Sequence, residues 1–172
     1  MDLALYDPEF GYYARAAQRS GRAGDFFTNV DVGPIFGELL ARQIVEMAGI
    51  LGSPPRPSYL VEAGAGNGRL SADILRALDA TAPLLLRQLH LHLVEASPLA
   101  RDAQAGTLGA QAHRLASTSG VLPERYEGVL IANELLDAMP VHQVVMTKDG
   151  LREVFVAEDR GKLTAQEAEP ST

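Results

Sequence analysis

The sequence predicts an α/β protein with a Rossmann-like core, in which a mostly parallel sheet carries helices on both faces. Short apolar runs, typical of buried parallel strands, occur at residues 59–63, 89–95 and 128–133. Segments with apolar residues at helical spacing lie between the strands, at residues 69–80 and 98–105. A glycine-rich turn over residues 64–68 joins the first strand to the first of these helices.

Further elements flank this alternation. Pro34 predicts the start of a helix that runs to about residue 48. Asp149 and Gly150 predict a hairpin turn near the C-terminus. Further strands are expected at residues 112–115, 142–147 and 151–157. We find no segments suited to the last strands of a complete sheet, so we expect the core to be incomplete.

These elements divide the chain into three parts. Residues 1–58 form an N-terminal arm and a helix that packs on the core. Residues 59–157 form the Rossmann-like core, and residues 158–172 form a polar tail, of which we expect residues 165–172 to be frayed.

The composition limits the class of protein. A chain of 172 residues with 47% hydrophobic and 22% charged residues is typical of a globular domain that buries one core. There is no apolar run of about 18 residues, so we expect no membrane span. No basic segment followed by an apolar one comes after Met1, so we expect no secretory signal. We therefore expect a cytoplasmic protein in a bacterium, or a mitochondrial matrix protein in a eukaryote.

The charged residues and the absence of cysteine limit its chemistry. With no cysteine, disulfides, thiolate metal sites and cysteine nucleophiles are excluded. The net charge of -7 argues against a nucleic-acid partner, which would require basic residues to neutralise its phosphates. The same charge favours a cationic partner, such as a protein segment that carries an arginine.

The glycine turn predicts a cofactor site. Gly64, Gly66 and Gly68 lack Cβ atoms, so the backbone can turn tightly and approach a ligand. In the dinucleotide fingerprint the third glycine comes one residue later, at the position that Arg69 holds here. Glu62 places a carboxylate beside the turn, where it would repel a pyrophosphate. The pattern resembles motif I of class I methyltransferases, which use S-adenosylmethionine (SAM); a dinucleotide and a purely structural turn stay open as alternatives.

The second strand ends in Glu95. A carboxylate at this position of a doubly wound sheet can accept hydrogen bonds from ribose hydroxyls, or it can be an ordinary surface residue. Ser97 and Pro98 predict the start of the following helix. His90 and His92 share one face of this strand, but no suitable third ligand is near in the sequence, so we expect no metal site.

The third strand ends in a polar cluster. Asn133, Glu134 and Asp137 follow the apolar run at 128–133. Because ligands of open α/β sheets bind outside the carboxyl ends of the strands, we expect these residues at the same edge as the glycine turn and Glu95.

Several segments together resemble the MidA-type family, which is related to the mitochondrial arginine methyltransferase of complex I assembly. They are residues 5–13, 24–28, 36–40, 94–97, 133–142 and 152–156. Their order and approximate spacing also agree, so the resemblance covers residues 2 to about 157. Residues 29–32 depart from it, because relatives more often have Ser-Pro-Glu there. Members of the family are much longer, so the chain resembles their N-terminal half only.

The resemblance implies a SAM-dependent methyltransferase that modifies an arginine of a protein, as relatives do symmetrically on a respiratory complex I subunit. It implies that the glycines wrap the cofactor, that Glu95 holds its ribose and that an N-terminal loop closes over it. The cofactor-binding residues expected from the turn and the resemblance are Glu62, Gly64, Ala65, Gly66, Gly68, Glu95, Ala96, Asn133, Gly24, Asp25 and Thr28.

Glu134 and Asp137 are the candidate catalytic residues. A guanidinium keeps its proton up to a pKa above about 12, so carboxylates must orient it and assist proton loss. Asp137 could equally be a turn residue. Two other functions stay open, a non-catalytic SAM-binding or assembly module and, less favoured, an NAD-dependent oxidoreductase. We expect the 172-residue chain to bind SAM weakly and to turn over slowly.

Overall fold

The computed structural model describes residues 1–13, 28–52 and 58–172, except the side chain of Leu51. Gly24 and Asp25, predicted to close over the cofactor, lie outside the described residues. The chain forms two compact units, one of residues 3–138 and one of residues 1–2 with residues 139–172. The division after residue 138 falls inside the core predicted at residues 59–157.

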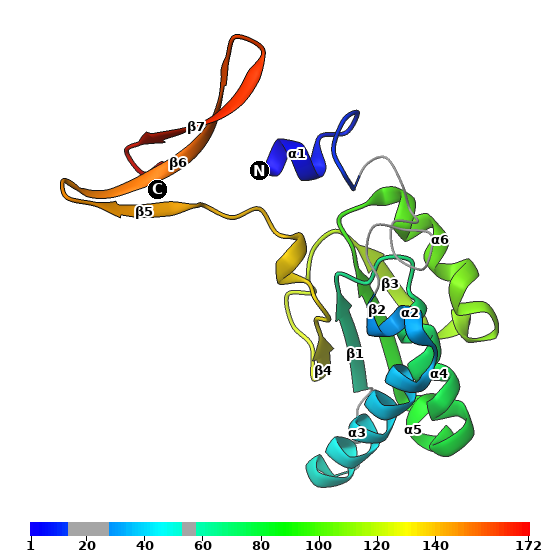
Figure 1. Ribbon diagram of the computed structural model, residues 1–172. Helices are drawn as coiled ribbons and strands as arrows, with labels where there is room; N and C mark the ends of the chain where they lie inside the picture. The colour runs from blue at the N-terminus through cyan, green and yellow to red at the C-terminus, as the bar shows by residue number, and fades with distance from the viewer. Residues whose placement is uncertain (14–27, 53–57) are drawn as a thin grey trace. The chain divides into compact units, whose positions relative to one another are not determined.

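The larger unit contains a parallel sheet of four strands in the order β3-β2-β1-β4 (Figure 1). Their bounds are β1 Ser58–Ala63, β2 Leu89–Val94, β3 Leu115–Ser119 and β4 Gly128–Ile131. Leu60 of β1 is in register with Leu91 of β2 and with Val129 of β4. The parallel sheet predicted from the sequence is confirmed. The strand expected at residues 112–115 begins three residues later, because a 3-10 helix, η1 (Gly109–Arg114), precedes it.

Helices cover one face of this sheet in the part of the chain that the structure describes. They are α3 Ile35–Leu51, α4 Arg69–Thr81, α5 Pro83–Gln88 and α6 Pro98–Leu108. Leu60 and Leu91 point into this layer and pack with Ile74, Leu75 and Leu78 of α4, all fully buried. The opposite face carries His90 and Leu130, which are exposed. The helical layer holds β1 and β2 in place, and these strands position the residues at their carboxyl ends.

Gly37 brings α3 close to α4. A Cβ on Gly37 would lie 2.6 Å from the Cβ of Asp73, so a larger residue would force the two helices apart. Gly49 is near the end of the same helix, and no described atom lies within 4 Å of the position that its Cβ would take. An added methyl group would therefore collide with α4 at Gly37 and would meet no described atom at Gly49.

The N-terminal arm contains two short helices, α1 (Asp2–Tyr6) and α2 (Asn29–Val32). The Tyr6 hydroxyl donates a hydrogen bond of 2.6 Å to the carbonyl of Ala138, at the end of the 3-10 helix η2 (Leu136–Ala138). The Tyr6 ring stacks on that of Tyr13, with 5.4 Å between the ring centroids. The aromatic residues of the arm therefore pack against the segment that follows β4.

The smaller unit is a separate antiparallel sheet of three strands, β5 Val144–Thr147, β6 Gly150–Asp159 and β7 Lys162–Ala168. The predicted hairpin at Asp149 and Gly150 is confirmed. Strand β7 lies within the segment predicted as a polar tail, and a turn at Arg160 and Gly161, with φ of 50° and 78°, leads into it.

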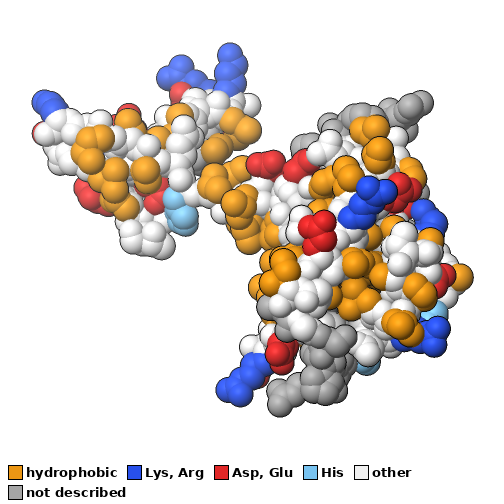
Figure 2. Space-filling model, turned by 90° about the horizontal axis from the view of Figure 1, so that it is seen from below, with side chains coloured by type: hydrophobic (Ala, Val, Ile, Leu, Met, Phe, Trp, Pro, Cys, Tyr) orange, Lys and Arg blue, Asp and Glu red, His pale blue; other side chains and the backbone are white. Residues whose placement is uncertain are grey.

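Glu153 is the only buried residue of the segment 139–172, all of which the structure describes. Its carboxylate accepts hydrogen bonds from the Ser171 backbone N–H (2.7 Å) and the Ser171 hydroxyl (2.8 Å), and lies 2.7 Å from His142 Nδ1. These bonds, led by that of the Ser171 backbone, lower the pKa of Glu153 to about 2. Figure 2 shows hydrophobic side chains on the surface of this sheet. The exposed hydrophobic residues of its strands include Met146, Val156 and Leu163. None of the described helices is long and apolar enough to cross a membrane.

The two glycines of α3 generate a test of the helix packing. Gly37→Ala should lower the free energy of unfolding by about 1–3 kcal/mol, because the added methyl group overpacks the α3–α4 contact. Gly49→Ala should raise it by about 0.5–1 kcal/mol, because alanine loses less backbone entropy in a helix. Urea denaturation followed by circular dichroism measures both. Equal stability of the two variants would contradict the packing described here.

Candidate functional site

The glycine turn lies at the carboxyl edge of the parallel sheet, between β1 and α4. Gly64, Gly66 and Gly68 have φ of 72°, 51° and 85°, values that other residues adopt only with strain. The N–H groups of Gly64 and Ala65 both donate to the Val94 carbonyl, at 2.9 and 3.1 Å. The turn is thereby fixed to the end of β2, which also carries Glu95.

Glu95 holds the middle of the turn. Its Oε2 accepts a hydrogen bond of 2.9 Å from the Gly66 N–H, and its Oε1 accepts one of 2.8 Å from the Ser97 N–H. Each carboxylate oxygen has a second lone pair, so Glu95 can accept further bonds from hydroxyl groups of a ligand. No described atom lies within 4 Å of the position that a Cβ on Gly66 would take. The turn therefore presents an open backbone next to a carboxylate that still has acceptor capacity.

Gln104 of α6, which was not predicted from the sequence, contacts the other side of Gly66. Its Nε2 donates a hydrogen bond of 2.9 Å to the Gly66 carbonyl, and its Oε1 accepts one of 2.5 Å from the Thr118 hydroxyl. The side chain is fully buried. Ala100, Gln104 and Leu108 recur every four residues and are all buried. A polar residue on that buried stripe was a signal that could have revealed it.

Glu62 is buried beneath the turn and not exposed beside it. Its carboxyl accepts a hydrogen bond from the hydroxyl of Ser71, on the buried face of α4. Burial, with a smaller contribution from the charge of Glu95, raises the pKa of Glu62 to about 7, although the Ser71 bonds oppose the shift. This carboxyl can therefore hold or release a proton near neutral pH.

The segment after β4 lies beside the turn, as predicted. A Cβ on Gly64 would lie 2.9 Å from Cδ1 of Leu135. Glu134 is exposed and adopts φ of 53°, a left-handed conformation that is uncommon for residues other than glycine. Asp137 is exposed in η2, and Asn133 is half-buried.

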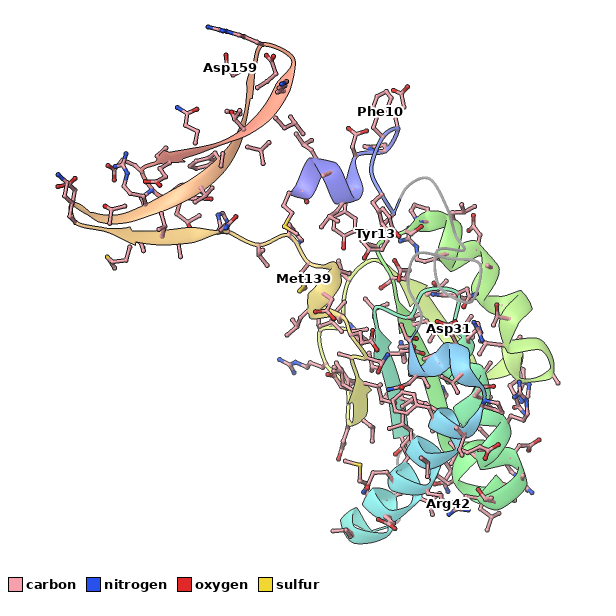
Figure 3. The ribbon with its side chains drawn as sticks, in the orientation of Figure 1. Phe10, Tyr13, Asp31, Arg42, Met139 and Asp159 are labelled. Carbon is pink, nitrogen blue, oxygen red and sulfur yellow. The ribbon has the colours of Figure 1, made fainter. Side chains whose placement is uncertain are left out.

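Tyr13 interacts electrostatically with two of the acidic residues, Glu95 and Asp137. Burial, and then the charges of Glu95 and Asp137, raise the pKa of its phenol. The phenol therefore lies within the field of both carboxylates and keeps its proton as a hydrogen-bond donor. Figure 3 shows Tyr13 on the N-terminal segment, near the edge where the parallel strands end. Tyr13 is not among the site residues predicted from the sequence.

Thr28 begins α2, which is tied to the start of α4. Asp31, whose side chain is 2% exposed, accepts a hydrogen bond of 2.9 Å from the Thr28 N–H and pairs with Arg69 at 2.7 Å (Figure 3). Asp31 belongs to the segment 29–32, which departs from the family pattern. Arg69 therefore forms an ion pair with a buried carboxylate. It holds the position of the third glycine of a dinucleotide site.

His90 and His92 lie together against the ring of Tyr59, at 5.8 and 5.1 Å between ring centroids. His92 Nδ1 is 2.7 Å from the Ser117 hydroxyl, and burial, followed by the charge of His90, lowers the pKa of His92. In the described ranges, no three His, Asp or Glu side chains are grouped in a way that could hold a metal ion.

Residues 39–172 match the family described as "Putative S-adenosyl-L-methionine-dependent methyltransferase". The chain belongs to this family. The match confirms the family resemblance found in the sequence and SAM as its cofactor.

Curated relatives include the mitochondrial protein arginine methyltransferase NDUFAF7 of several animals. The mouse protein is 34% identical, over 92% of this chain and 41% of its own length. The human protein is 32% identical, over 91% of this chain and 40% of its own. The chain thus spans less than half the length of these relatives.

Two crystal structures of Burkholderia thailandensis proteins are similar along almost the whole chain. One, bound to S-adenosyl-homocysteine (SAH), has a TM-score of 0.80 and 35% identity, and covers 99% of this chain and 44% of its own. The other has a TM-score of 0.76 and 33% identity, and covers 99% of this chain and 42% of its own. The roles assigned to individual residues, and the cytoplasmic or mitochondrial location, stay predictions.

The buried carboxyl of Glu62 generates a test by pH. Its pKa rises from 4.5 to about 7 on folding. The folded chain therefore keeps a proton that the unfolded chain loses between these values, so the free energy of unfolding falls as pH rises from 4.5 to 7. The loss amounts to about 3 kcal/mol. In Glu62→Gln this loss should disappear, as measured by urea denaturation across this pH range.

The exposed Glu46 of α3 provides the control for this measurement. Glu46→Gln should keep the pH profile of the unmodified chain. A Glu62→Gln profile parallel to that of the unmodified chain would show that Glu62 does not hold a proton near neutral pH.

Proposed function

We propose that the chain binds SAM at the glycine turn and is the cofactor-binding part of a methyltransferase that modifies arginine side chains of a protein. The observation that carries the proposal is the Gly66 peptide. Its N–H is held by Glu95 at 2.9 Å, and no described atom lies within 4 Å of the position that a Cβ on Gly66 would take. A ribose on Glu95 and an adenosyl group along the turn fit this arrangement.

The charges around the turn favour SAM over a dinucleotide. Glu95 lies at this edge, and its charge contributes to the raised pKa of Glu62, which is buried beneath the turn. Arg69, the cation next to the turn, is paired with Asp31. A diphosphate would therefore meet the carboxylate of Glu95 and a guanidinium that is already neutralised. A ligand with a sulfonium and an amino group gains from the same carboxylate.

The bound cofactor supplies an electrophilic methyl group. The residues of this chain bind, orient and accept charge around it. Glu95 fixes the ribose, and the open side of the turn aligns the rest of the molecule. Ala65, Ala96 and Asn133 line the same strand ends, and Thr28 starts the helix that Asp31 ties to α4.

The acidic edge suits a guanidinium substrate. Glu134 and Asp137 are exposed after β4, and Tyr13 lies within the field of Asp137 and Glu95. A guanidinium has no free lone pair until it loses a proton, so carboxylates that orient it and assist proton loss are the groups it needs. The strained backbone of Glu134 supports its assignment as the first of these, because such strain is concentrated at functional sites. The relatives named protein arginine methyltransferase support the same substrate.

A SAM-binding module without turnover is the second candidate. The observation in its favour is the length of the chain, which spans 40–44% of the relatives and structures that it matches. The two candidates share the cofactor site and differ in methyl transfer.

Cofactor binding tests the common part of both candidates. The 172-residue chain should bind SAH, and NAD⁺ should not compete, as measured by isothermal titration calorimetry. Glu95→Gln should weaken SAH binding roughly tenfold or more, because the amide cannot accept the bonds of Gly66, Ser97 and a ribose together. The exposed Glu167→Gln should bind as the unmodified chain does. Competition by NAD⁺ would refute the assignment of the turn to SAM.

Methyl transfer separates the two candidates. With methyl-labelled SAM, an arginine-containing peptide should be labelled, and its Arg→Lys counterpart should not. Glu134→Gln should reduce the rate at least tenfold through loss of the carboxylate. Glu134→Gly should lose the same activity and raise the free energy of unfolding by about 1 kcal/mol, because glycine accepts the positive φ. SAH binding without any labelling would favour the non-catalytic module, and a full rate in Glu134→Gln would remove Glu134 from the mechanism.

A further inference from the structure

Gly66 is held by side chains at both polar atoms of its backbone. Glu95 Oε2 accepts from its N–H at 2.9 Å, and Gln104 Nε2 donates to its carbonyl at 2.9 Å. Between these two bonds, the open side of Gly66 faces no described atom within 4 Å. The peptide groups on both sides of the open Gly66 α-carbon are therefore fixed by side chains.

The amide of Gln104 has one orientation that satisfies all of its partners. The Gly66 carbonyl can only accept, so it must meet the Nε2 side. The Oε1 side then faces the Thr118 hydroxyl, which donates at 2.5 Å. Because the side chain is fully buried, water cannot replace either bond. A residue of the same volume without a donor would leave the Gly66 carbonyl without this partner.

Glu95 and Gln104 belong to one continuous piece of structure. Glu95 directly follows β2 and binds the Ser97 N–H, and Ser97 caps α6, which carries Gln104 two turns later. The Cγ of Gln104 also lies 3.7 Å from the position that a Cβ on Gly68 would take. The end of β2 and helix α6 therefore contact the turn from two sides.

We propose that Gln104 is a positioning residue for the cofactor, which fixes the Gly66 peptide through its amide N–H and so sets the affinity of the turn for its ligand. This inference rests on the proposed function. It adds a requirement that the family description and the predicted site do not contain, namely a buried hydrogen-bond donor at position 104.

The variant Gln104→Glu tests the donor directly. The glutamate matches the shape of glutamine, but its ionised form cannot donate to the Gly66 carbonyl. At pH 8.5 it should bind SAH roughly tenfold or more weakly than the unmodified chain. At pH 5.5 the buried carboxyl should be protonated and able to donate, so the affinity should return to within about threefold of the unmodified chain.

Two further variants separate the donor from volume and charge. Gln104→Met keeps the approximate length without a donor, so it should bind SAH weakly at both pH values. Gln166→Glu, exposed on β7, adds the same charge elsewhere and should not change the affinity. All affinities are compared with the unmodified chain at the same pH, which removes the titration of Glu62 from the comparison. A ratio for Gln104→Glu that does not change with pH, or SAH binding by Gln104→Met as tight as that of the unmodified chain, would overturn the proposal.

A measurement without cofactor separates this inference from the proposed function. Amide hydrogen exchange followed by NMR should show faster exchange at Gly66 and Gly68 in Gln104→Met, with unchanged exchange at Leu60 and Leu91 in the strands. Unchanged exchange at the glycines would show that Gln104 does not hold the turn. If the unmodified chain bound no SAH, the proposed function and the effect on affinity would both fail, and the exchange data would still decide whether Gln104 fixes the peptide.

Discussion

The carboxylate of Glu95 is the interaction on which the rest of the site depends. It joins the glycine turn after β1 to the start of α6 through two charge-assisted hydrogen bonds. The backbone of the same residue donates to the Ser119 carbonyl at the end of β3 and accepts from the Arg101 guanidinium at 2.6 Å. One residue thus fixes the relative positions of three strand ends and one helix. A ligand that used the remaining lone pairs of this carboxylate would meet a surface that is already in place, and little ordering would be needed on binding.

The sequence predicted the fold wherever burial leaves a pattern. Strands β1 and β2 are enclosed by α4 and its neighbours, so their apolar runs stood out, and the glycines marked the turn between β1 and α4. Strand β3, Leu115–Ser119, is an edge strand of mostly small polar residues, and no apolar run indicates its position. Strand β7 is almost entirely exposed. Its pairing with β6 follows from the turn at Arg160 and Gly161, and the polar residues around this turn show no pattern typical of a strand. Helix α5 is too short for its periodicity to be recognised.

The site was predictable as far as topology determines it. Parallel strands place their carboxyl ends at one edge, so Gly66, Glu95 and Asp137 could be assigned to a common place from the sequence. The supporting contacts could not, because helix packing brings Gln104 to Gly66, Ser71 to Glu62 and Asp31 to Arg69. Gln104 and Ser71 are polar residues on helix faces that are otherwise buried, and Asp31 has a buried carboxylate. Such positions become visible only when a helix has been assigned and its inner face is examined for residues that do not suit an apolar layer.

The antiparallel sheet of residues 144–168 has a different physical basis from the parallel one. Its only buried residue is the carboxylate Glu153, whereas Met146 and Leu151 are exposed on one face and Val156 and Leu163 on the other. The ladder is therefore held by backbone hydrogen bonds that water can reach from both sides. Local opening of this sheet should cost much less free energy than opening of the parallel sheet, whose bonds lie under a layer of helices. Proteases in limiting amounts should accordingly cut within residues 139–172 before they cut within the parallel sheet, and leave the glycine turn and Glu95 intact.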